Sequence, residues 1–303
     1  MSDSFDKQVG LIGLGAVGTP LASRLLAHGI ALSVLDTDTQ AMASVVEMGA
    51  KTLPSPESAA KLGVVLLSLP SSAALDEVMT GQSGLLNGVG EQTIIADLST
   101  VDPDTSRYWA ALVAERGGAY LDAPITCSVT TGGGTAAAAS GDLTFLVGGE
   151  KAAFEAIRGL LAMLGRCFHH LGPSGAGSVM KLISNHLSGI QTLAIAEVLT
   201  LAEACGFSAH QTLDICRDTV AQSYVLESIV KPRLDNPANT AHFAIELMGK
   251  DHRLIGGLAK SLGIELPMNK MALALCDEMS SAGYARRDNV ASVEYFRKRR
   301  EQD

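Results

Sequence analysis

Basic residues, paired cysteines and long apolar runs are all scarce in this chain. Lys and Arg number 23 against 32 Asp and Glu, which gives a net charge of −9. An acidic chain has no general attraction for nucleic acid or for an anionic membrane. The basic runs at 286–287 and 297–300 are therefore expected to form solvated helix faces or to pair with acidic surface. We expect neither a nucleic-acid partner nor a membrane partner.

The five cysteines are odd in number and include no Cys-x-x-Cys pair. This pattern favours buried, reduced thiols over disulfides or zinc, and no metal site is predicted. The polar, acidic start MSDSFDKQ resembles neither a secretory signal nor an Arg-rich transit peptide. No run approaches the roughly 18 consecutive apolar residues of a membrane span. Together these features predict a soluble cytoplasmic protein.

What the chain does contain is enough apolar sequence for a large core. Hydrophobic residues make up 47% of 303 residues, and the 31 glycines are dispersed, which excludes a disordered or collagen-like chain. At roughly 100 to 200 residues per domain, this length predicts about two domains.

The first half alternates short apolar runs with helical patterns. The predicted strands cover residues 8–12, 31–36, 64–69 and 93–97, with weaker candidates at 119–122 and 144–147. Nearly continuous apolar strands separated by helices are typical of a parallel sheet that is covered on both faces.

Helical patterns dominate from about Val179 onward. They cover residues 179–205, 209–219, 224–232, 246–262 and 267–282. The predicted fold is α/β: a doubly wound parallel Rossmann sheet in a nucleotide-binding domain over 1–171, then an all-α domain over 172–303. The second domain includes a long connecting helix and is expected to serve the substrate and subunit contacts.

A glycine-rich motif directly follows the first predicted strand. It comprises Gly13, Leu14, Gly15, Ala16, Val17 and Gly18. In this position the glycines allow a tight turn, close approach of a pyrophosphate, and packing of the next helix, whose N-terminus attracts the phosphates. The alternative is a glycine turn that binds nothing.

Asp36 ends the second predicted strand, 18 residues after Gly18. A carboxylate there can accept hydrogen bonds from the adenosine ribose and would repel a 2′-phosphate. No Lys or Arg lies between Asp36 and Glu47 to hold such a phosphate. The predicted cofactor is therefore NAD rather than NADP.

A second group of polar residues lies further along the chain. It comprises Asp122-Ala-Pro124, the stretch 172–177, Lys181 with Asn185, and Lys250-Asp251. Lys181 and Asn185 are four residues apart and share one helix face, as recognition of a small polar group would require. Spacing alone leaves open an ordinary solvent-exposed Lys and Asn.

These motifs, with 10–18 and Asp97-Leu-Ser-Thr100, occur in an order that resembles the β-hydroxyacid dehydrogenase family over nearly the whole chain. The resemblance implies an NAD-dependent enzyme that interconverts a short 3-hydroxy acid and its semialdehyde or ketone. Lys181 would be the general acid and base and Asn185 would hold the substrate. The resemblance also implies that Leu69, Pro70, Thr100 and Lys250 border the cofactor, and that Asp251 orients Lys250.

The chain departs from the family's substrate motif after Asp122-Ala-Pro124. Val-Ser-Gly-Gly is replaced by Ile-Thr-Cys-Ser, so Thr126, Cys127 and Ser128 are candidates to bind the substrate carboxylate. Alternatively an insertion precedes residues 131–133, which then take the motif's place. A third reading is a lengthened surface loop. The usual substrates of the family are therefore in question.

Competing functions remain at this level. A 6-phosphogluconate dehydrogenase would carry His where Ser184 stands, and an imine reductase typically replaces the lysine found here at Lys181. A nonenzymatic NAD-binding sensor would have no evident use for Lys181, Asn185 and Lys250. The apolar helix after Lys181 exceeds what a small helical domain covers, so a homodimer or homotetramer is expected, with the active site in the cleft between the domains.

Overall fold

A six-stranded parallel sheet organises the first part of the chain in the computed structural model, which describes residues 8–127, 134–235 and 242–302. The strand order is β3-β2-β1-β4-β5-β6. The bounds are Val9–Ile12 for β1, Leu32–Leu35 for β2, Lys51–Thr52 for β3, Val64–Leu67 for β4, Ile94–Asp97 for β5 and Ala119–Asp122 for β6. The chain leaves β1 in opposite directions, toward β2 and toward β4, and doubly wound sheets bind ligands at such a switch point.

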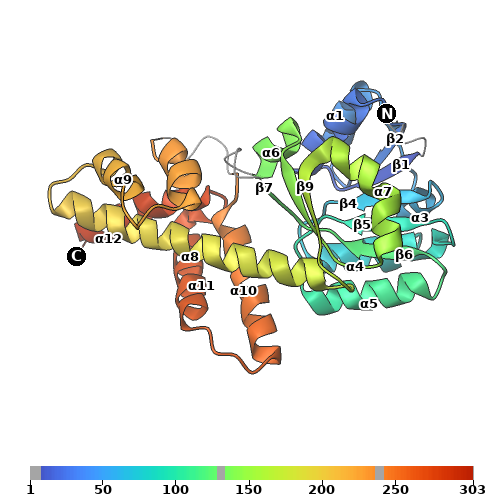
Figure 1. Cartoon of the computed structure of the whole chain (residues 1–303). Helices are drawn as coiled ribbons and strands as arrows, with labels where there is room; N and C mark the ends of the chain where they lie inside the picture. The colour runs from blue at the N-terminus through green and yellow to red at the C-terminus, as the bar shows by residue number, and fades with distance from the viewer. Residues whose placement is uncertain (1–7, 128–133, 236–241, 303) are drawn as a thin grey trace. The chain divides into compact units, whose positions relative to one another are not determined.

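Helices cover both faces of this sheet (Figure 1). Side chains alternate along each strand: Leu11 enters the core beneath α1, α2 and α7, whereas Ile12 enters the core beneath α3, α4 and α5. The helix bounds are Gly18–Ala27 for α1, Thr39–Glu47 for α2, Pro56–Ala60 for α3, Ser72–Thr80 for α4, Pro103–Ala114 for α5 and Lys151–Leu164 for α7. A short 3₁₀ turn, Leu85–Gly88, follows α4. The predicted doubly wound arrangement is confirmed.

A second, three-stranded sheet adjoins the first through a bridge between Asp122 and Gly148. Its strands are β7 (Ile125–Cys127), β8 (Leu143–Val147) and β9 (Gly165–His170), and α6 (Gly134–Ser140) precedes β8. Strands β3, β7 and β9 were not predicted. β3 is an exposed two-residue edge, and β9 mixes Arg and His with apolar residues, so neither has the apolar run of a central strand.

The rest of the chain is helical. The α-helices are α8 (Ala176–Ala204), α9 (Ala209–Arg217), α10 (Ile245–Ser261), α11 (Pro267–Met279) and α12 (Ser292–Gln302). Shorter 3₁₀ and π-helical turns cover Val225–Val230, Lys231–Arg233, Ser280–Tyr284 and Asn289–Ala291. Among the described residues after Lys181, the only β pairing is an isolated bridge between Ala244 and Asp288.

The contacts divide the chain into two compact units at residue 181, within α8. The first unit holds the described residues through Lys181 and the second holds Leu182 onward. The first turn of α8 belongs to the first unit because Asp122 at the end of β6 binds it. The expected boundary at 171–172, which rests on binding roles, stays a prediction.

All five cysteines are free, but they are not uniformly buried. Cys276 is buried, Cys127, Cys167 and Cys216 are half-buried, and Cys205 is exposed. The prediction of buried thiols is therefore wrong for Cys205, which follows the last turn of α8. In the C-terminal basic run, Arg297, Lys298 and Arg299 each pair with a glutamate, as expected.

Candidate active site

The glycine-rich turn between β1 and α1 contains two glycines required by packing and one that faces open space. Gly13 has a φ of +98°, and a Cβ there would lie 2.2 Å from the Ser68 carbonyl oxygen. A Cβ on Gly18 would lie 1.9 Å from the Gly13 carbonyl oxygen. A Cβ on Gly15 would meet nothing within 4 Å. The turn is thus closely packed at Gly13 and Gly18, whereas the space next to Gly15 is open.

The N-terminus of α1 lies at this turn without a capping side chain. Within the described chain, Val17 makes no side-chain capping bond and no acidic residue stands in the first turn of the helix. The Thr19 hydroxyl donates to the Leu14 carbonyl at 2.6 Å, which holds the turn against the helix. Uncapped N–H groups and the positive end of a helix suit a phosphate. The residues at 13–18 therefore fit the pyrophosphate of a dinucleotide.

Asp36 lies beside the same turn, just after β2. Its carboxylate accepts hydrogen bonds from the Leu14 N–H and, at 2.7 Å, from the Asp38 N–H. The structure therefore brings the predicted ribose-binding carboxylate to the glycine-rich turn.

The segments after β4 and β5 are joined by hydrogen bonds. The Leu69 N–H donates to the Ser99 hydroxyl at 2.9 Å, and the Ser99 N–H donates to Asp97 Oδ1 at 3.0 Å. Buried Tyr120 completes the chain by donating to Asp97 Oδ2 at 2.8 Å. Burial and the nearby Asp97 raise the pKa of Tyr120 well above its usual value, so it stays a donor. These bonds position Leu69, Pro70 and Thr100 at the carboxyl end of the sheet.

Lys181 and Asn185 lie one turn apart on α8, and both are half-buried. Lys181 belongs to the first unit and Asn185 to the second. The Asn185 Nδ2 donates to Asp251 Oδ2 at 2.6 Å. Asp251 is 2% exposed, and its Oδ1 lies 3.3 Å from the Lys250 Nζ. Asp251 thus contacts both predicted residues of the second unit, Asn185 and Lys250.

A buried His-Asn pair supports this group, and sequence reasoning missed it. His252 is completely buried, and its Nδ1 lies 2.8 Å from Asn269 Oδ1, while Asn269 Nδ2 donates to the His252 carbonyl at 3.0 Å. This network makes Nδ1 the protonated nitrogen. Burial lowers the pKa of His252, so the ring is neutral at physiological pH. Asn269 lies 17 residues along on α11, and no sequence signal indicates that separation.

The proposed substrate-binding residues are only partly described. Thr126 and Cys127 lie on β7, are half-buried, and pair with Thr144 and Leu143 of β8. Ser128 and residues 131–133, which carry the second alignment, lie outside the described residues.

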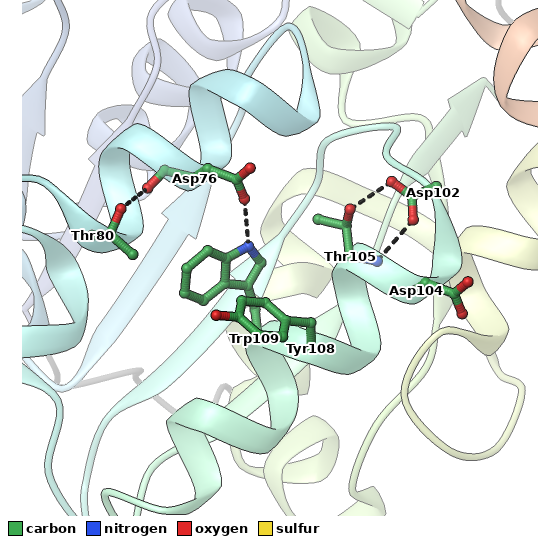
Figure 2. Close-up of a pocket in the computed structure, with 7 residues that line it drawn as sticks. All are labelled: Asp76, Thr80, Asp102, Asp104, Thr105, Tyr108 and Trp109. Atoms are coloured by element: carbon green, nitrogen blue, oxygen red, sulfur yellow. Dashed lines mark hydrogen bonds between the residues drawn. The ribbon is translucent and has the colours of Figure 1, made fainter.

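A shallow pocket of about 450 Å³ lies between α4 and α5 (Figure 2). Its carboxylates are already engaged: Asp76 accepts from the Trp109 indole at 3.0 Å, and Asp102 accepts from the Thr105 N–H at 2.8 Å and from its hydroxyl. Its lining includes none of the residues predicted to bind cofactor or substrate. Across the described residues, no group of three or more His, Cys, Asp or Glu could hold a metal ion.

Comparison with known proteins gives matches over nearly the whole chain. Residues 8–172 match the family model described as the NAD-binding domain of 6-phosphogluconate dehydrogenase. Residues 175–296 match the family model described as NAD-binding of NADP-dependent 3-hydroxyisobutyrate dehydrogenase.

Individual relatives cover similar lengths. The chain is 36% identical to an NAD-dependent L-serine dehydrogenase of Pseudomonas aeruginosa, over 93% of this chain and 95% of that protein. It is 32% identical to a 2-(hydroxymethyl)glutarate dehydrogenase of Eubacterium barkeri, over 95% and 94%.

Among solved structures, a Mycobacterium tuberculosis 3-hydroxyisobutyrate dehydrogenase with L-serine matches with a TM-score of 0.84 and 25% identity. That match covers 96% of this chain and 99% of the other. The glycine-rich turn, the order of the sheet and these relatives agree: the chain belongs to the β-hydroxyacid dehydrogenase family, NAD(P)-dependent enzymes that interconvert hydroxy acids and semialdehydes.

Proposed function

We propose that this enzyme uses NAD to oxidise a short 3-hydroxy acid, or to reduce the matching semialdehyde, with Lys181 as the general acid and base. The observation that carries the proposal is the pair of half-buried side chains on α8, Lys181 and Asn185, one turn apart. Asp251 holds the Asn185 carboxamide through a 2.6 Å hydrogen bond. A fixed amide next to a lysine suits an alcohol or carbonyl oxygen that must exchange a proton.

The chain's own residues handle the proton. In the oxidative direction the neutral Lys181 amine accepts the hydroxyl proton, and in the reductive direction its ammonium donates a proton to the carbonyl oxygen. Asn185 orients that oxygen toward Lys181. Lys250, paired with Asp251, adds a fixed positive charge. When bound, NAD supplies the nicotinamide carbon that accepts or returns the hydride.

The substrate class follows from the relatives' names and from β7. L-serine and 2-(hydroxymethyl)glutarate both carry a hydroxymethyl group on the carbon next to a carboxylate, and they differ in the other substituent. We assign the carboxylate to Thr126 and Cys127, and to Ser128 beyond them. Because this segment departs from the family motif, the variable substituent is expected to face it.

The cofactor preference rests on Asp36. Its carboxylate adjoins the glycine-rich turn, where a 2′-phosphate would meet a negative charge, and no Lys or Arg lies in the following stretch through Glu47. We therefore propose that the domain over 1–171 binds NAD rather than NADP. To the domain over 172–303 we assign the subunit contacts and the part of the substrate site formed by Lys181 and Asn185. The five free thiols fit a reducing, cytoplasmic setting.

A homodimer or homotetramer is proposed from the surface of α8. This helix exposes a stripe of apolar side chains: Met180, Ile183, Leu187, Val198 and Leu201, of which Leu201 is 67% exposed. Among the described residues, α8 is the one helix that is long and apolar enough to cross a membrane by length and composition, with 28% of that window buried. A helix from a second copy would remove the same apolar surface from water.

The test is a substrate screen combined with a lysine variant. We expect turnover of 3-hydroxy acids with NAD, and a loss of about 10²- to 10⁴-fold in kcat for Lys181→Ala, because the proton transfer loses its catalyst. Lys61→Ala is the matched control, since Lys61 caps the C-terminus of α3 and pairs with Glu57 at 2.8 Å, and the residues predicted to bind cofactor or substrate do not include it. Wild-type kcat in a folded Lys181→Ala protein would overturn the proposed mechanism.

A further inference from the structure

A single buried carboxylate, that of Asp122, binds the start of the helix that carries Lys181. Asp122 ends β6 and is 1% exposed. Its Oδ1 accepts the Gly175 N–H at 2.8 Å, and its Oδ2 accepts the Ser178 N–H at 2.9 Å. Both carboxylate oxygens thus accept N–H groups at the start of α8: Gly175 directly precedes the helix, and Ser178 lies in its first turn, three residues before Lys181. A negative charge there also complements the positive end of the helix.

The surroundings of this carboxylate are built to fit it closely. A Cβ on Gly148 would lie 2.5 Å from Asp122 Oδ1 and 2.8 Å from Oδ2. A Cβ on Gly177 would lie 2.2 Å from the Leu146 carbonyl oxygen and 2.5 Å from that of Asp122. Gly175 has a φ of +90°, which a residue with a side chain rarely adopts. Three glycines therefore let α8 begin directly against the end of β6.

Burying this carboxylate costs desolvation free energy, so we expect a role of Asp122 other than stabilising the fold. Burial raises the pKa of Asp122, and the bonds from Gly175 and Ser178 only partly offset that effect. Within the described ranges no Lys or Arg forms an ion pair with it. A buried charge without a counter-ion stabilises a fold poorly compared with an apolar residue of similar size.

The same residue leads directly into the proposed substrate strand. Ala123 and Pro124 connect Asp122 to β7, where Thr126 and Cys127 lie. The Gly148 N–H donates to the Asp122 carbonyl at 2.8 Å, and the Leu146 N–H donates to that of Pro124 at 3.1 Å. The backbone of Asp122 therefore positions the substrate strand, while its side chain positions the lysine helix.

We propose that Asp122 is a positioning residue of the reaction, which couples the register of Lys181 to that of the substrate-binding strand through the Gly175 and Ser178 amides. The inference rests on the proposed role of Lys181. It assigns Asp122 no contact with substrate or cofactor. A displacement of Lys181 of the order of 1 Å is sufficient to impair proton transfer.

The test compares two variants that disturb the carboxylate with one that does not. Asp122→Asn replaces an acceptor oxygen with an amide group that cannot accept an N–H. Gly148→Ala keeps the charge but pushes the carboxylate away. Ser106→Ala is the matched control: it removes the buried 2.9 Å contact between the Ser106 and Ser178 hydroxyls and leaves both amide bonds to Asp122 intact.

We expect kcat to fall about 10- to 100-fold in Asp122→Asn and Gly148→Ala, with the dissociation constant of NAD unchanged and with kcat preserved in Ser106→Ala. In a Lys181→Ala background, Asp122→Asn should cause no further loss, because both changes remove the same function. Folding of each variant is checked by thermal unfolding. If Asp122→Asn does not fold, the kcat of Gly148→Ala tests the positioning role of Asp122.

Three outcomes would separate the two proposals. If Lys181→Ala abolishes turnover but both carboxylate variants keep wild-type kcat, the positioning role is overturned and the proposed function stands. If Asp122→Asn costs the same factor with and without Lys181, Asp122 does not act through Lys181 and the inference fails. Full activity of Lys181→Ala itself would instead remove the proposed mechanism.

Discussion

At the scale of single residues, substitution of Asp36 is expected to change the preference for NAD over NADP. Replacing Asp36 with Ser removes the charge that we propose faces the ribose 2′ position, and keeps a hydrogen-bonding hydroxyl. We expect the ratio of kcat/KM for NAD to that for NADP to fall by roughly tenfold or more, because one unit of charge repulsion is removed. The measurement is steady-state kinetics with each cofactor.

Asp38→Ser is the matched control for this change. Asp38 lies two residues further on and caps α2 by accepting the Gln40 and Ala41 N–H groups. Serine also caps helices, so the fold and the cofactor ratio are both expected to persist. An equal loss of NAD preference in the Asp38 variant would show that the effect reflects general charge and not a contact to the ribose.

The residues that sequence reasoning found and those it missed differ in how their partners are spaced. Gly13, Gly18 and Asp36 belong to one local unit of strand, turn, helix and strand, so their spacing in the sequence predicts their proximity. Asn185 and Asp251 were both named from their motifs, but the hydrogen bond between them spans 66 residues, and the buried pair of His252 and Asn269 joins two different helices. Each of these partners can be recognised only once the helices are packed.

At the scale of elements, the crossing of α8 and α10 depends on Gly189. A Cβ there would lie 2.6 Å from the His252 Nε2. We expect Gly189→Ala to lower the free energy of unfolding by about 1–3 kcal/mol, because an added methyl overpacks the contact. Thermal or urea unfolding measures the effect.

Gly257 supplies the opposite case on the same helix pair. It lies within α10, and a Cβ there would meet nothing within 4 Å. Gly257→Ala should therefore raise the free energy of unfolding by about 0.5–1 kcal/mol through the lower entropy of the unfolded chain. If both alanine variants changed stability in the same direction, close packing at Gly189 would not be the cause.

Elements with a buried apolar face were predicted from the sequence, and those without one were missed. The four central strands and the helices α8, α9, α10 and α11 were predicted within a few residues, because each carries a sustained apolar pattern. The predicted helix over 224–232 is instead a π-helical turn followed by a 3₁₀ turn, and α12, which is rich in charged residues, was not among the predicted helices. β3 has only exposed residues, and the π-helical turn at Val225–Val230 has no periodicity that distinguishes it from an α-helix. The hydrogen bonds from Gly175 and Ser178 to Asp122 span more than 50 residues, so the sequence does not indicate that the start of α8 belongs to the first unit.

At the scale of the whole molecule, the apolar stripe on α8 determines the expected assembly. Light scattering after size-exclusion chromatography should give a dimer or tetramer for the wild type. Leu187→Glu with Leu201→Glu should shift it toward the monomer, because two charges would be buried in the interface. Leu187 and Leu201 are 61% and 67% exposed, so neither change should disturb the core of the single chain.

Val220→Glu is the control for this assembly. Val220 lies outside α8 and is fully exposed, so an added charge there should leave the mass unchanged. A monomeric wild type would refute the proposed interface.

Trp109 gives the molecule an internal optical reporter. It is the sole tryptophan, it is 2% exposed, and its indole donates to Asp76 within the first unit (Figure 2). Intrinsic fluorescence excited at the red edge of protein absorption therefore monitors unfolding of the Rossmann unit alone, whereas far-ultraviolet circular dichroism sums over the helices of both units. Any separation between the two melting curves measures how far the halves of this enzyme unfold independently.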